Sequence, residues 1–236
     1  MNESPDPLPE RVLGVFAHPD DPEFFAGGTF AKFAAAGSAV AFVVATSGDK
    51  GSSEPEMTSA RLAAIREAEE TAAASALGVP QVCFLRYPDG ALQVSLELRE
   101  ALTRVIRKLR PELVITCDPQ VFYRDGGSLN HPDHRAIGEA TLDAVYPTAR
   151  DRLNYPQHEQ EGLAPHKVRH LYIAGSPNPN FRVDVSDHID TQVKALAEHR
   201  SQISDIQRLD EMIRERTRDA ENDRHYEYFH RVVMRQ

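Results

Sequence analysis

The stretch that decides the fold is RVLGVFAHPDDPEFFAGGT, residues Arg11–Thr29. It begins with an apolar run of strand length, RVLGVFA, which is typical of a buried parallel β-strand. A polar turn, HPDD at residues 18–21, follows, and Gly27-Gly28 then opens a helical pattern that runs to about Ala36 and stops at Gly37. Strand, turn and helix in this order build an α/β sheet, whose ligands bind at the carboxyl ends of the strands. The HPDD turn is therefore expected at a ligand-binding edge.

A second cluster, HPDH at residues 131–134, follows a strand in a similar way. The apolar run Leu113–Cys117 predicts a strand, and the long polar loop Asp118–Asn130 connects it to the cluster. Pro132 suits the first turn of a helix, which we expect to run to about Tyr146.

Strands and helices alternate between the two clusters. We expect strands at Val40–Thr46 and Val82–Leu85, and helices at Ser59–Leu77 and Leu96–Leu109. This order predicts an α/β fold, namely a Rossmann-like, mostly parallel sheet with helices on both faces. Because the carboxyl ends of parallel strands share one edge, both histidine clusters are expected there.

The C-terminal third has a less regular pattern, which predicts a small α/β extension of the core. Pro147–Pro165 is expected to be irregular, and a charged helical stretch, broken or continuous, spans Asp187 to about Arg218. Added strands are expected at Val168–Ala174, Phe181–Val185 and Tyr226–Val233. We therefore predict a loose leader at residues 1–10 and a single domain at 11–236, with a core at 11–150 and a cap or extension at 151–236.

The length, net charge and apolar content of the chain argue against several classes of protein. The chain has 236 residues and a formal net charge of −9, which suits one globular domain and argues against a nucleic-acid binder. Its first ten residues, MNESPDPLPE, lack the basic and apolar regions of a signal peptide, and no apolar run approaches the roughly 20 residues of a membrane span. We expect a cytoplasmic protein without a membrane partner. Cys83 and Cys117 lie in apolar runs and are expected to be buried, reduced thiols.

The two clusters carry the ligand types of a catalytic metal site. Imidazole and carboxylate groups bind zinc-type ions, commonly as three protein ligands with one position left open. In the HPDD turn, His18 and Asp21 can point at one ion, while Asp20 between them is better placed to approach a water molecule. In the second cluster, His131 and His134 share a helix face, and His134 could complete the site with His131 nearby.

Simpler interpretations exist for each cluster. Asp20 or Asp21 could merely cap the following helix, and Asn130 or Asp133 could cap the second helix beside exposed histidines. The strand–turn–helix start also suggests a nucleotide-binding fold, but no G-x-G-x-x-G follows Ala17.

Other residues are weaker candidates. Arg66 lies on the second helix, where pairing with Glu70 is the ordinary expectation. Asp89 is part of an ordinary Asp-Gly turn, although in a loop at the active edge. Glu23 could orient a metal ligand from behind or brace the glycine turn. His199 is by default a surface histidine, with contact to substrate as the alternative.

The sequence resembles the PIG-L/LmbE-like deacetylases, which remove acetyl groups from N-acetylglucosamine-type sugars. The resemblance rests on VFAHPDDPEFFAGGT and NHPDHR at their separation in the chain. It covers most of the chain, extending through Arg66-Glu67-Ala68-Glu69, Leu77-Gly78-Val79, Tyr87-Pro88-Asp89-Gly90 and Ala197-Glu198-His199-Arg200-Ser201-Gln202.

The resemblance implies a set of roles. Zinc would be held by His18, Asp21 and His134, with Asp20 as general base and His131 assisting the oxyanion or the leaving amine. Arg66 and Asp89 match positions that resemble the family's sugar contacts, and Asp133 would be a helix-start or supporting residue. Our mechanistic hypothesis is metal-assisted hydrolysis of an acetamide, in which His131 is protonated, and this predicts a bell-shaped pH profile. The family also makes a homo-oligomer an open possibility.

Two features depart from the common family pattern. Pro22 intervenes before Glu23, where the family often has Glu directly, and the loop Tyr123–Asn130 is longer and more polar than in many members. The substrate's aglycone therefore stays open, as does the metal, since two histidines and one carboxylate also suit Fe²⁺. The rival hypotheses are hydrolysis of another amide or conjugate, and a metal- or sugar-binding protein without catalysis.

Overall fold

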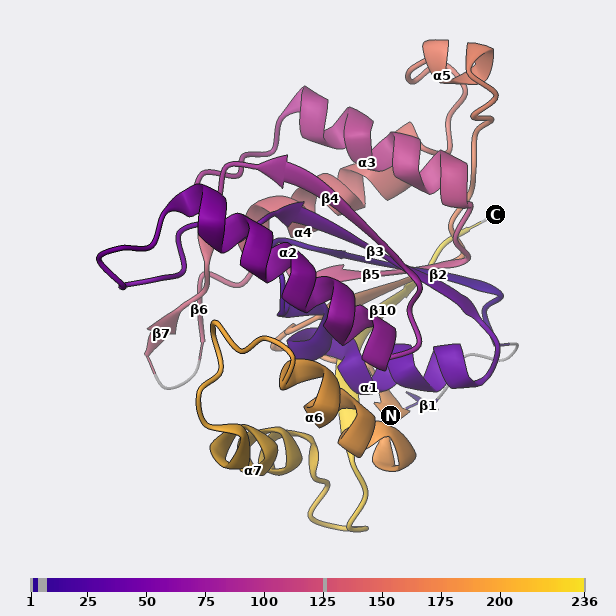
Figure 1. The fold of residues 1–236 in the computed structure, drawn as a ribbon. Coiled ribbons are helices and arrows are strands. Elements are labelled where there is room, and N and C mark those ends of the chain that lie inside the picture. Colours follow the sequence, from indigo (N-terminus) through magenta and orange to yellow (C-terminus); the bar gives the residue numbers. More distant parts are fainter. Residues whose placement is uncertain (1, 4–7, 125–126, 236) are drawn as a thin grey trace.

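The computed structural model describes residues 2–3, 8–124 and 127–235. Within them, eight strands form one sheet in the order β1-β9-β10-β8-β5-β2-β3-β4 (Figure 1). The strands are β1 (Asn2–Glu3), β2 (Arg11–Phe16), β3 (Ala39–Thr46), β4 (Gln81–Tyr87), β5 (Leu113–Cys117), β8 (His170–Ala174), β9 (Phe181–Asp184) and β10 (Tyr226–Val233). β10 is antiparallel to β8 and β9, whereas the other described pairings in this sheet are parallel. The predicted fold class is confirmed.

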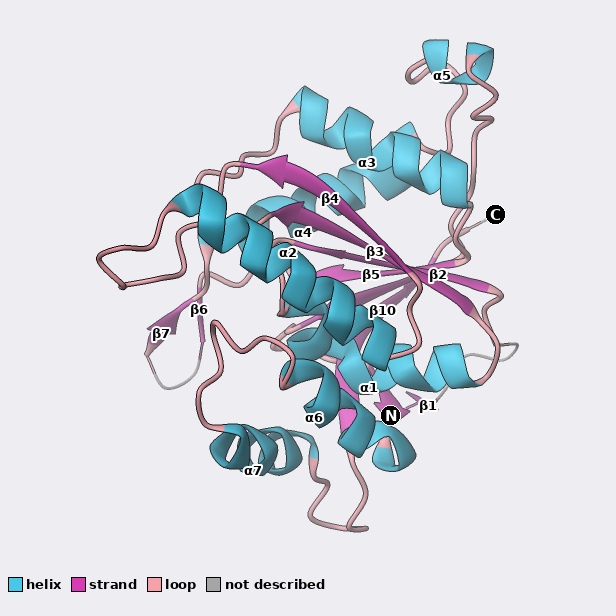
Figure 2. Cartoon of the chain, in the orientation of Figure 1, coloured by secondary structure: helices cyan, strands magenta, loops and turns pink. Residues whose placement is uncertain are grey.

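Helices cover both faces of the sheet (Figure 2). The helices of one face are α1 (Asp21–Ala35), α2 (Ser59–Ala76), α6 (Ile189–Leu196) and α7 (Ile206–Thr217), and those of the other are α3 (Leu96–Leu109) and α4 (Pro132–Asp143). The central strand β2 is buried on both sides because successive side chains of a strand point to opposite faces. Val12 and Phe16 pack with the first group of helices, and Leu13 and Val15 with the second.

Several short elements complete the chain. A hairpin of β6 (Tyr123–Arg124) and β7 (Ser128–Leu129) precedes α4, and a π-helical turn, η1 (Ala144–Thr148), follows it. Further along are α5 (Gln157–Gln160), within the predicted irregular stretch, and a 3₁₀ turn, η2 (Ser186–His188).

Most predicted boundaries of helices and strands agree with the structure. For three elements, α3, β5 and β10, both the first and the last residue are as predicted. The charged C-terminal stretch is broken, since α6 and α7 are separate helices. The helix after the second cluster ends at Asp143 and passes into η1, so the expected regular helix to Tyr146 is wrong in its last turn.

The start of α1 corrects a prediction. The helix begins at Asp21, six residues before Gly27, with Pro22 in its first turn, and it is kinked at Ala26, where φ is −154°. The glycines have another purpose, which is close packing. A Cβ at Gly27 would lie 2.7 Å from the side chain of Gln192, and one at Gly28 would lie 2.7 Å from that of Val185. The glycine pair therefore marks a site of close packing inside α1 rather than the start of the helix.

The C-terminal strands continue the core sheet. β8 pairs with β5 in parallel, and β10 links β8 to β9. Part of the expected leader is ordered against this region, because Asn2–Glu3 pairs with β9. Residues 4–7 of that leader lie outside the described residues. None of the described helices combines the length and the apolar character that a membrane span needs.

Candidate active site

The two histidine–aspartate clusters meet at the carboxyl edge of the sheet. The HPDD turn follows β2, and the HPDH residues begin α4 beyond the neighbouring strand β5. His18 Nδ1 lies 3.3 Å from Asp21 Oδ2 and 3.3 Å from His134 Nε2, and His134 Nε2 lies 3.0 Å from Asp21 Oδ1. Ligands about 2.0–2.1 Å from a tetrahedral ion lie roughly 3.3 Å apart. The spacing of these three donor groups therefore suits one small metal ion.

In both His18 and His134, the ring nitrogen that points away from the other proposed ligands faces an oxygen acceptor. His18 Nε2 lies 3.2 Å from Asp89 Oδ1 and 3.3 Å from Asp133 Oδ2, and His134 Nδ1 lies 3.1 Å from Asn130 Oδ1. A histidine that binds a metal characteristically donates its other N–H to a carboxylate or carbonyl oxygen, which fixes the tautomer and the ring orientation. Both rings are thus oriented with the free nitrogen toward the shared point, which is a second reason that the residues fit a metal ion.

The electrostatics of the cluster favour a cation. Burial lowers the pKa of His18, but hydrogen bonds to Asp133, Asp21 and Asp89 outweigh burial and raise that pKa to about 12. Burial raises the pKa of Asp21, yet its contacts with His134 and His18 bring it well below the usual value. A pocket that retains a proton so strongly is rich in negative charge, and a divalent ion would satisfy the same carboxylates.

Asp20 has an unusual backbone conformation, with φ of 95°. A non-glycine residue in this region is strained, and such residues gather at functional sites. The Asp20 carboxylate accepts a hydrogen bond from Arg66 Nη2 at 3.0 Å. Burial and the nearby Asp21 raise the pKa of Asp20 to about 6, against opposing contributions from Arg66, His199 and His18.

His131 begins α4, and its tautomer follows from its hydrogen bond. The backbone N–H of Asp133 donates to His131 Nδ1 at 3.2 Å, so Nε2 carries the proton of the neutral ring. Burial and the positive charge of His18 lower the pKa of His131. The ring packs edge-on against His18, with centroids 4.5 Å apart. A neutral His131 can still donate a hydrogen bond from Nε2.

A cavity of about 520 Å³ opens over these side chains. It is lined by His18, Asp20, Asp21, Lys50, Gly51, Arg66, Asp89, Gly90, His131 and His134. Eight of these ten residues carry ionisable side chains, which suits a polar ligand.

A comparison with protein families decides the family. Residues 13–145, more than half of the chain, match the family described as PIG-L: GlcNAc-PI de-N-acetylase. The chain belongs to the PIG-L family. The resemblance predicted from the two histidine motifs is thereby confirmed.

Individual relatives of this PIG-L protein agree with that assignment. The chain is 33% identical over 193 residues to a diacetylchitobiose deacetylase of Thermococcus kodakarensis, covering 82% of this chain and 70% of the relative. The structure of N,N'-diacetylchitobiose deacetylase from Pyrococcus horikoshii, complexed with an inhibitor, is similar with a TM-score of 0.86 at 29% identity. That match covers 95% of this chain and 84% of that one.

A more distant neighbour has a different activity. GalB from Pseudomonas putida, a 4-carboxy-2-hydroxymuconate hydratase, has a TM-score of 0.77 at 22% identity and covers 96% of this chain and 98% of that one. At this identity the likeness shows the fold alone.

The structure brings most of the predicted site residues together in this PIG-L protein. Arg66 and Asp89 line the cavity, and Asp133 lies behind it, accepting the backbone N–H groups of Gly90 and Leu92. Arg66 is not on a solvated helix face, because it is buried beneath the HPDD turn.

His199 and Glu23 are placed differently from the cavity residues. Both are fully buried, with His199 Nε2 3.4 Å from Glu23 Oε2, and neither lines the cavity. The surface default for His199 is wrong, and direct contact with substrate does not fit its burial.

The sequence interpretation missed Lys50 and the role of Glu70. Lys50 lies in the glycine-rich loop after β3 and bonds to Asp89 through both its backbone N–H and its ammonium group. Glu70 is fully buried and accepts the backbone N–H of Asp20 at 3.0 Å. For Glu70 the sequence offered only the helical spacing of Leu62, Arg66, Glu70 and Ala73, which places them on one face of α2, and the structure shows that this face is buried.

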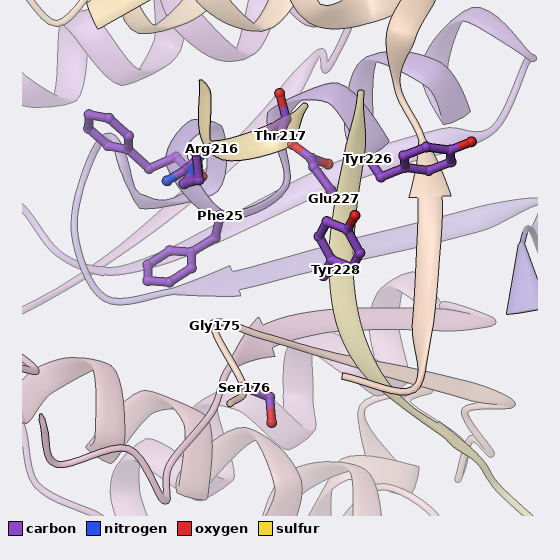
Figure 3. Close-up of a pocket in the computed structure, with 9 residues that line it drawn as sticks. Phe25, Gly175, Ser176, Arg216, Thr217, Tyr226, Glu227 and Tyr228 are labelled. Atoms are coloured by element: carbon purple, nitrogen blue, oxygen red, sulfur yellow. Dashed lines mark hydrogen bonds between the residues drawn. The ribbon is translucent and has the colours of Figure 1, made fainter. Parts of the chain in front are cut away.

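A second cavity, of about 280 Å³, lies between the start of α1, the turn after β8, the end of α7 and β10 (Figure 3). Its two charged residues, Arg216 and Glu227, form hydrogen bonds to the backbone of α1. Glu227 accepts the backbone N–H groups of Gly28 and Thr29 just beyond the kink of α1, and Arg216 donates to the carbonyl oxygen of Phe24. Phe25 lines this cavity and packs edge-on against His134. Phe25 therefore connects the wall of this cavity to one of the proposed metal ligands.

Proposed function

We propose that this protein is a metal-dependent N-deacetylase that hydrolyses the acetamide of an N-acetylglucosamine-type sugar or glycoconjugate. The observation that carries the proposal is the convergence of His18 Nδ1, His134 Nε2 and Asp21 on one point, with both outer histidine nitrogens facing oxygen acceptors. Membership of the PIG-L family and similarity to a diacetylchitobiose deacetylase support the substrate class.

The metal ligands would be His18, Asp21 and His134. A divalent ion held there would lower the pKa of a water molecule and polarise the acetyl carbonyl group. Zinc is our first choice, and Fe²⁺ suits the same ligands.

Asp20 would be the general base. Its carboxylate lies at the cavity beside the ligands, and Arg66 holds it at 3.0 Å. It would take a proton from the attacking water and later return it to the sugar nitrogen, which releases acetate and the free amine. A nearby dication would favour the ionised carboxylate that this role needs.

His131 would stabilise the oxyanion that forms on the acetyl oxygen. The backbone bond at Nδ1 leaves the Nε2 proton available for donation, so the ring can act while neutral. This differs from the mechanistic hypothesis made from the sequence, which required a protonated ring.

The sugar would be bound by Asp89, Lys50 and Arg66 at the cavity wall. Asp89 and Lys50 are already linked to each other and present charged groups to hydroxyls. Arg66 contributes less freely, because its guanidinium also binds the carbonyl oxygens of Gly48 and Pro19.

The test uses the purified full chain loaded with zinc. N-acetylglucosamine and diacetylchitobiose are supplied separately, and free amine and acetate are measured together. We expect equal amounts of both products, and Asp20→Asn should lower turnover by at least about 100-fold with unchanged metal content. Stoichiometric metal with no amine released from any acetylated amino sugar would refute the proposal and favour a non-catalytic binder.

A further inference from the structure

A group of polar side chains lies buried behind the HPDD turn, outside the cavity. Glu23, Glu70 and His199 each have no exposed surface. Their ligating atoms lie within 4.8 Å of one another. His199 Nε2 is 3.4 Å from Glu23 Oε2 and 3.8 Å from Glu70 Oε2. Buried charged groups are costly unless they compensate one another, so such a cluster needs a reason to exist.

The cluster reaches the proposed base through one peptide bond. The carbonyl oxygen of Pro19 accepts a hydrogen bond from Arg66 Nη2 at 2.6 Å, and the N–H of Asp20 donates to Glu70 Oε2 at 3.0 Å. These two backbone groups belong to the same peptide unit. Arg66 and Glu70 are one turn apart on α2, so a single helix face holds both ends of this unit.

This peptide unit controls the direction of the Asp20 side chain. Asp20 has φ of 95°, a conformation that L-residues adopt only when their surroundings impose it. If the N–H of Asp20 lost its acceptor, the peptide could turn toward the ordinary region. The Asp20 carboxylate would then move relative to Asp21 and His18.

His199 supports Glu70 in this contact. Burial and the neighbouring Glu23 raise the pKa of Glu70 well above its usual value, against smaller opposing contributions from His199 and the N–H of Asp20. His199 Nε2 lies 3.4 Å from Glu23 Oε2 and 3.8 Å from Glu70 Oε2, so the buried ring limits the directions in which the Glu70 carboxyl group can turn away from the N–H of Asp20. The cluster has no exposed surface through which it could meet a substrate.

We infer that Glu70 and His199 are positioning residues, which hold the strained backbone of Asp20 and so aim its carboxylate at the reacting water. The inference rests on the proposed function, because it assigns a role to residues behind the proposed base. It also gives a reason for the motif around His199 that does not require contact with the sugar.

Glu70→Ala and Glu70→Gln form the first test. The alanine variant removes the acceptor, and kcat should fall at least tenfold, while KM stays within about twofold and the protein keeps one equivalent of metal. The glutamine variant retains a carbonyl acceptor and should recover most of kcat. Equal losses in both variants, an unchanged kcat in Glu70→Ala, or a rise in KM alone would overturn the inference.

Glu69→Ala is the matched control. Glu69 is the preceding residue on α2 and bonds to Ser201, close to His199 in the chain, but it has no described contact with Asp20. Its kcat should stay within about twofold of the wild type. A loss as large as that of Glu70→Ala would mean that general weakening of this region lowers kcat, which contradicts a specific role for Glu70.

His199→Leu tests the second residue. It should lower kcat in the same way, and the double variant His199→Leu/Glu70→Ala should be no slower than Glu70→Ala alone, because His199 acts through Glu70. Multiplied effects would assign His199 a separate role and overturn its part of the inference.

A structural measurement separates this inference from the proposed function. Crystal structures of wild type and Glu70→Ala should show φ of Asp20 leaving the positive region only in the variant. This comparison needs no activity. If the wild type deacetylated no substrate, the two values of φ at Asp20 would still test the role of Glu70. An unchanged φ at Asp20 in the variant would overturn the inference.

Discussion

The atoms of individual residues decide the chemistry at this site. His18 has one nitrogen directed at Asp21 and His134 and the other at Asp89 and Asp133. The sequence identified His18 as a candidate ligand. Only the folded chain shows that Nδ1 faces the other proposed ligands and that Nε2 faces the carboxylates that orient the ring.

Removal of the metal should make His18 hold a proton. In the metal-free protein its pKa is about 12, so the ring is charged at neutral pH, and a metal ion must displace that proton. Because binding releases one proton below that pKa, metal affinity should rise about tenfold per pH unit between pH 6 and 8. Titration calorimetry of zinc in buffers of different ionisation enthalpy measures the released proton. Affinity independent of pH across this range would contradict the raised pKa of His18 in the metal-free protein.

Asp133→Asn should weaken metal binding. The change reduces the negative charge that faces His18 Nε2, and loss of such a supporting carboxylate typically costs 10–100-fold in metal affinity. Competition with a chelator measures the affinity. Glu139→Gln, an exposed change on the same helix, should leave it unaltered, and equal affinities for both variants would argue against support of His18 by Asp133.

At the scale of elements, close packing decides where the histidines of α4 lie. Gly138 lies on α4 against the end of β5, and a Cβ there would overlap the carbonyl oxygen of Cys117. The carbonyl belongs to a strand buried in the middle of the sheet and cannot easily move. The absence of a side chain at this one position lets α4 approach the sheet edge.

Gly138→Ala therefore tests whether steric overlap with Cys117 or the helix propensity of alanine dominates the stability of the variant. Helix propensity alone predicts that alanine stabilises the protein by about 1 kcal/mol. The overlap with Cys117 predicts the opposite sign, a loss of about 1–3 kcal/mol, together with weaker metal binding as His134 moves away. Urea denaturation of the metal-free protein and a chelator competition measure the two effects. A gain in stability would show that α4 can shift freely.

The inward face of α2 shows why element-level prediction was incomplete. The helix itself was predicted within one residue, but Arg66 and Glu70 occupy its buried face, between Leu62 and Ala73. Charged residues at buried positions do not resemble core residues in a sequence, so Arg66 was expected to pair with Glu70 or to contact the sugar, and neither residue was predicted to be buried. The HPDD turn supplies their partners, and that turn is more than 40 residues away in the chain.

At the scale of the whole molecule, one sheet unites the predicted core and the predicted extension. Phe181 and Phe229 belong to the same apolar cluster as Phe16 and Ile115. The boundary near residue 150 thus crosses a shared core, because β8 pairs with β5 along its full length.

A fragment of residues 11–150 should not fold by itself. Its strand β5 would become an edge strand of the sheet. The apolar cluster around Phe16 and Ile115 would lose Tyr172, Phe181 and Phe229, which are all buried in the whole chain. Burial of one such side chain contributes about 1.5–3 kcal/mol, which is large against the marginal stability of a domain. The fragment's heat denaturation, followed by circular dichroism, should lack a cooperative transition. A sharp transition would instead establish 11–150 as an independent unit.

The sequence by itself determined the fold class, the order of the elements and the two pieces of the site. Apolar runs and helical periodicity depend on neighbours within a few residues. In the motifs HPDD and HPDH the histidines and carboxylates that suit a metal site are adjacent in the sequence, so they can be recognised without the structure. The tertiary structure alone decided that α1 starts at Asp21, that His199 is buried, and that Glu70 accepts the backbone N–H of Asp20. These features depend on contacts between segments far apart in the chain, where burial and hydrogen bonding override local preference.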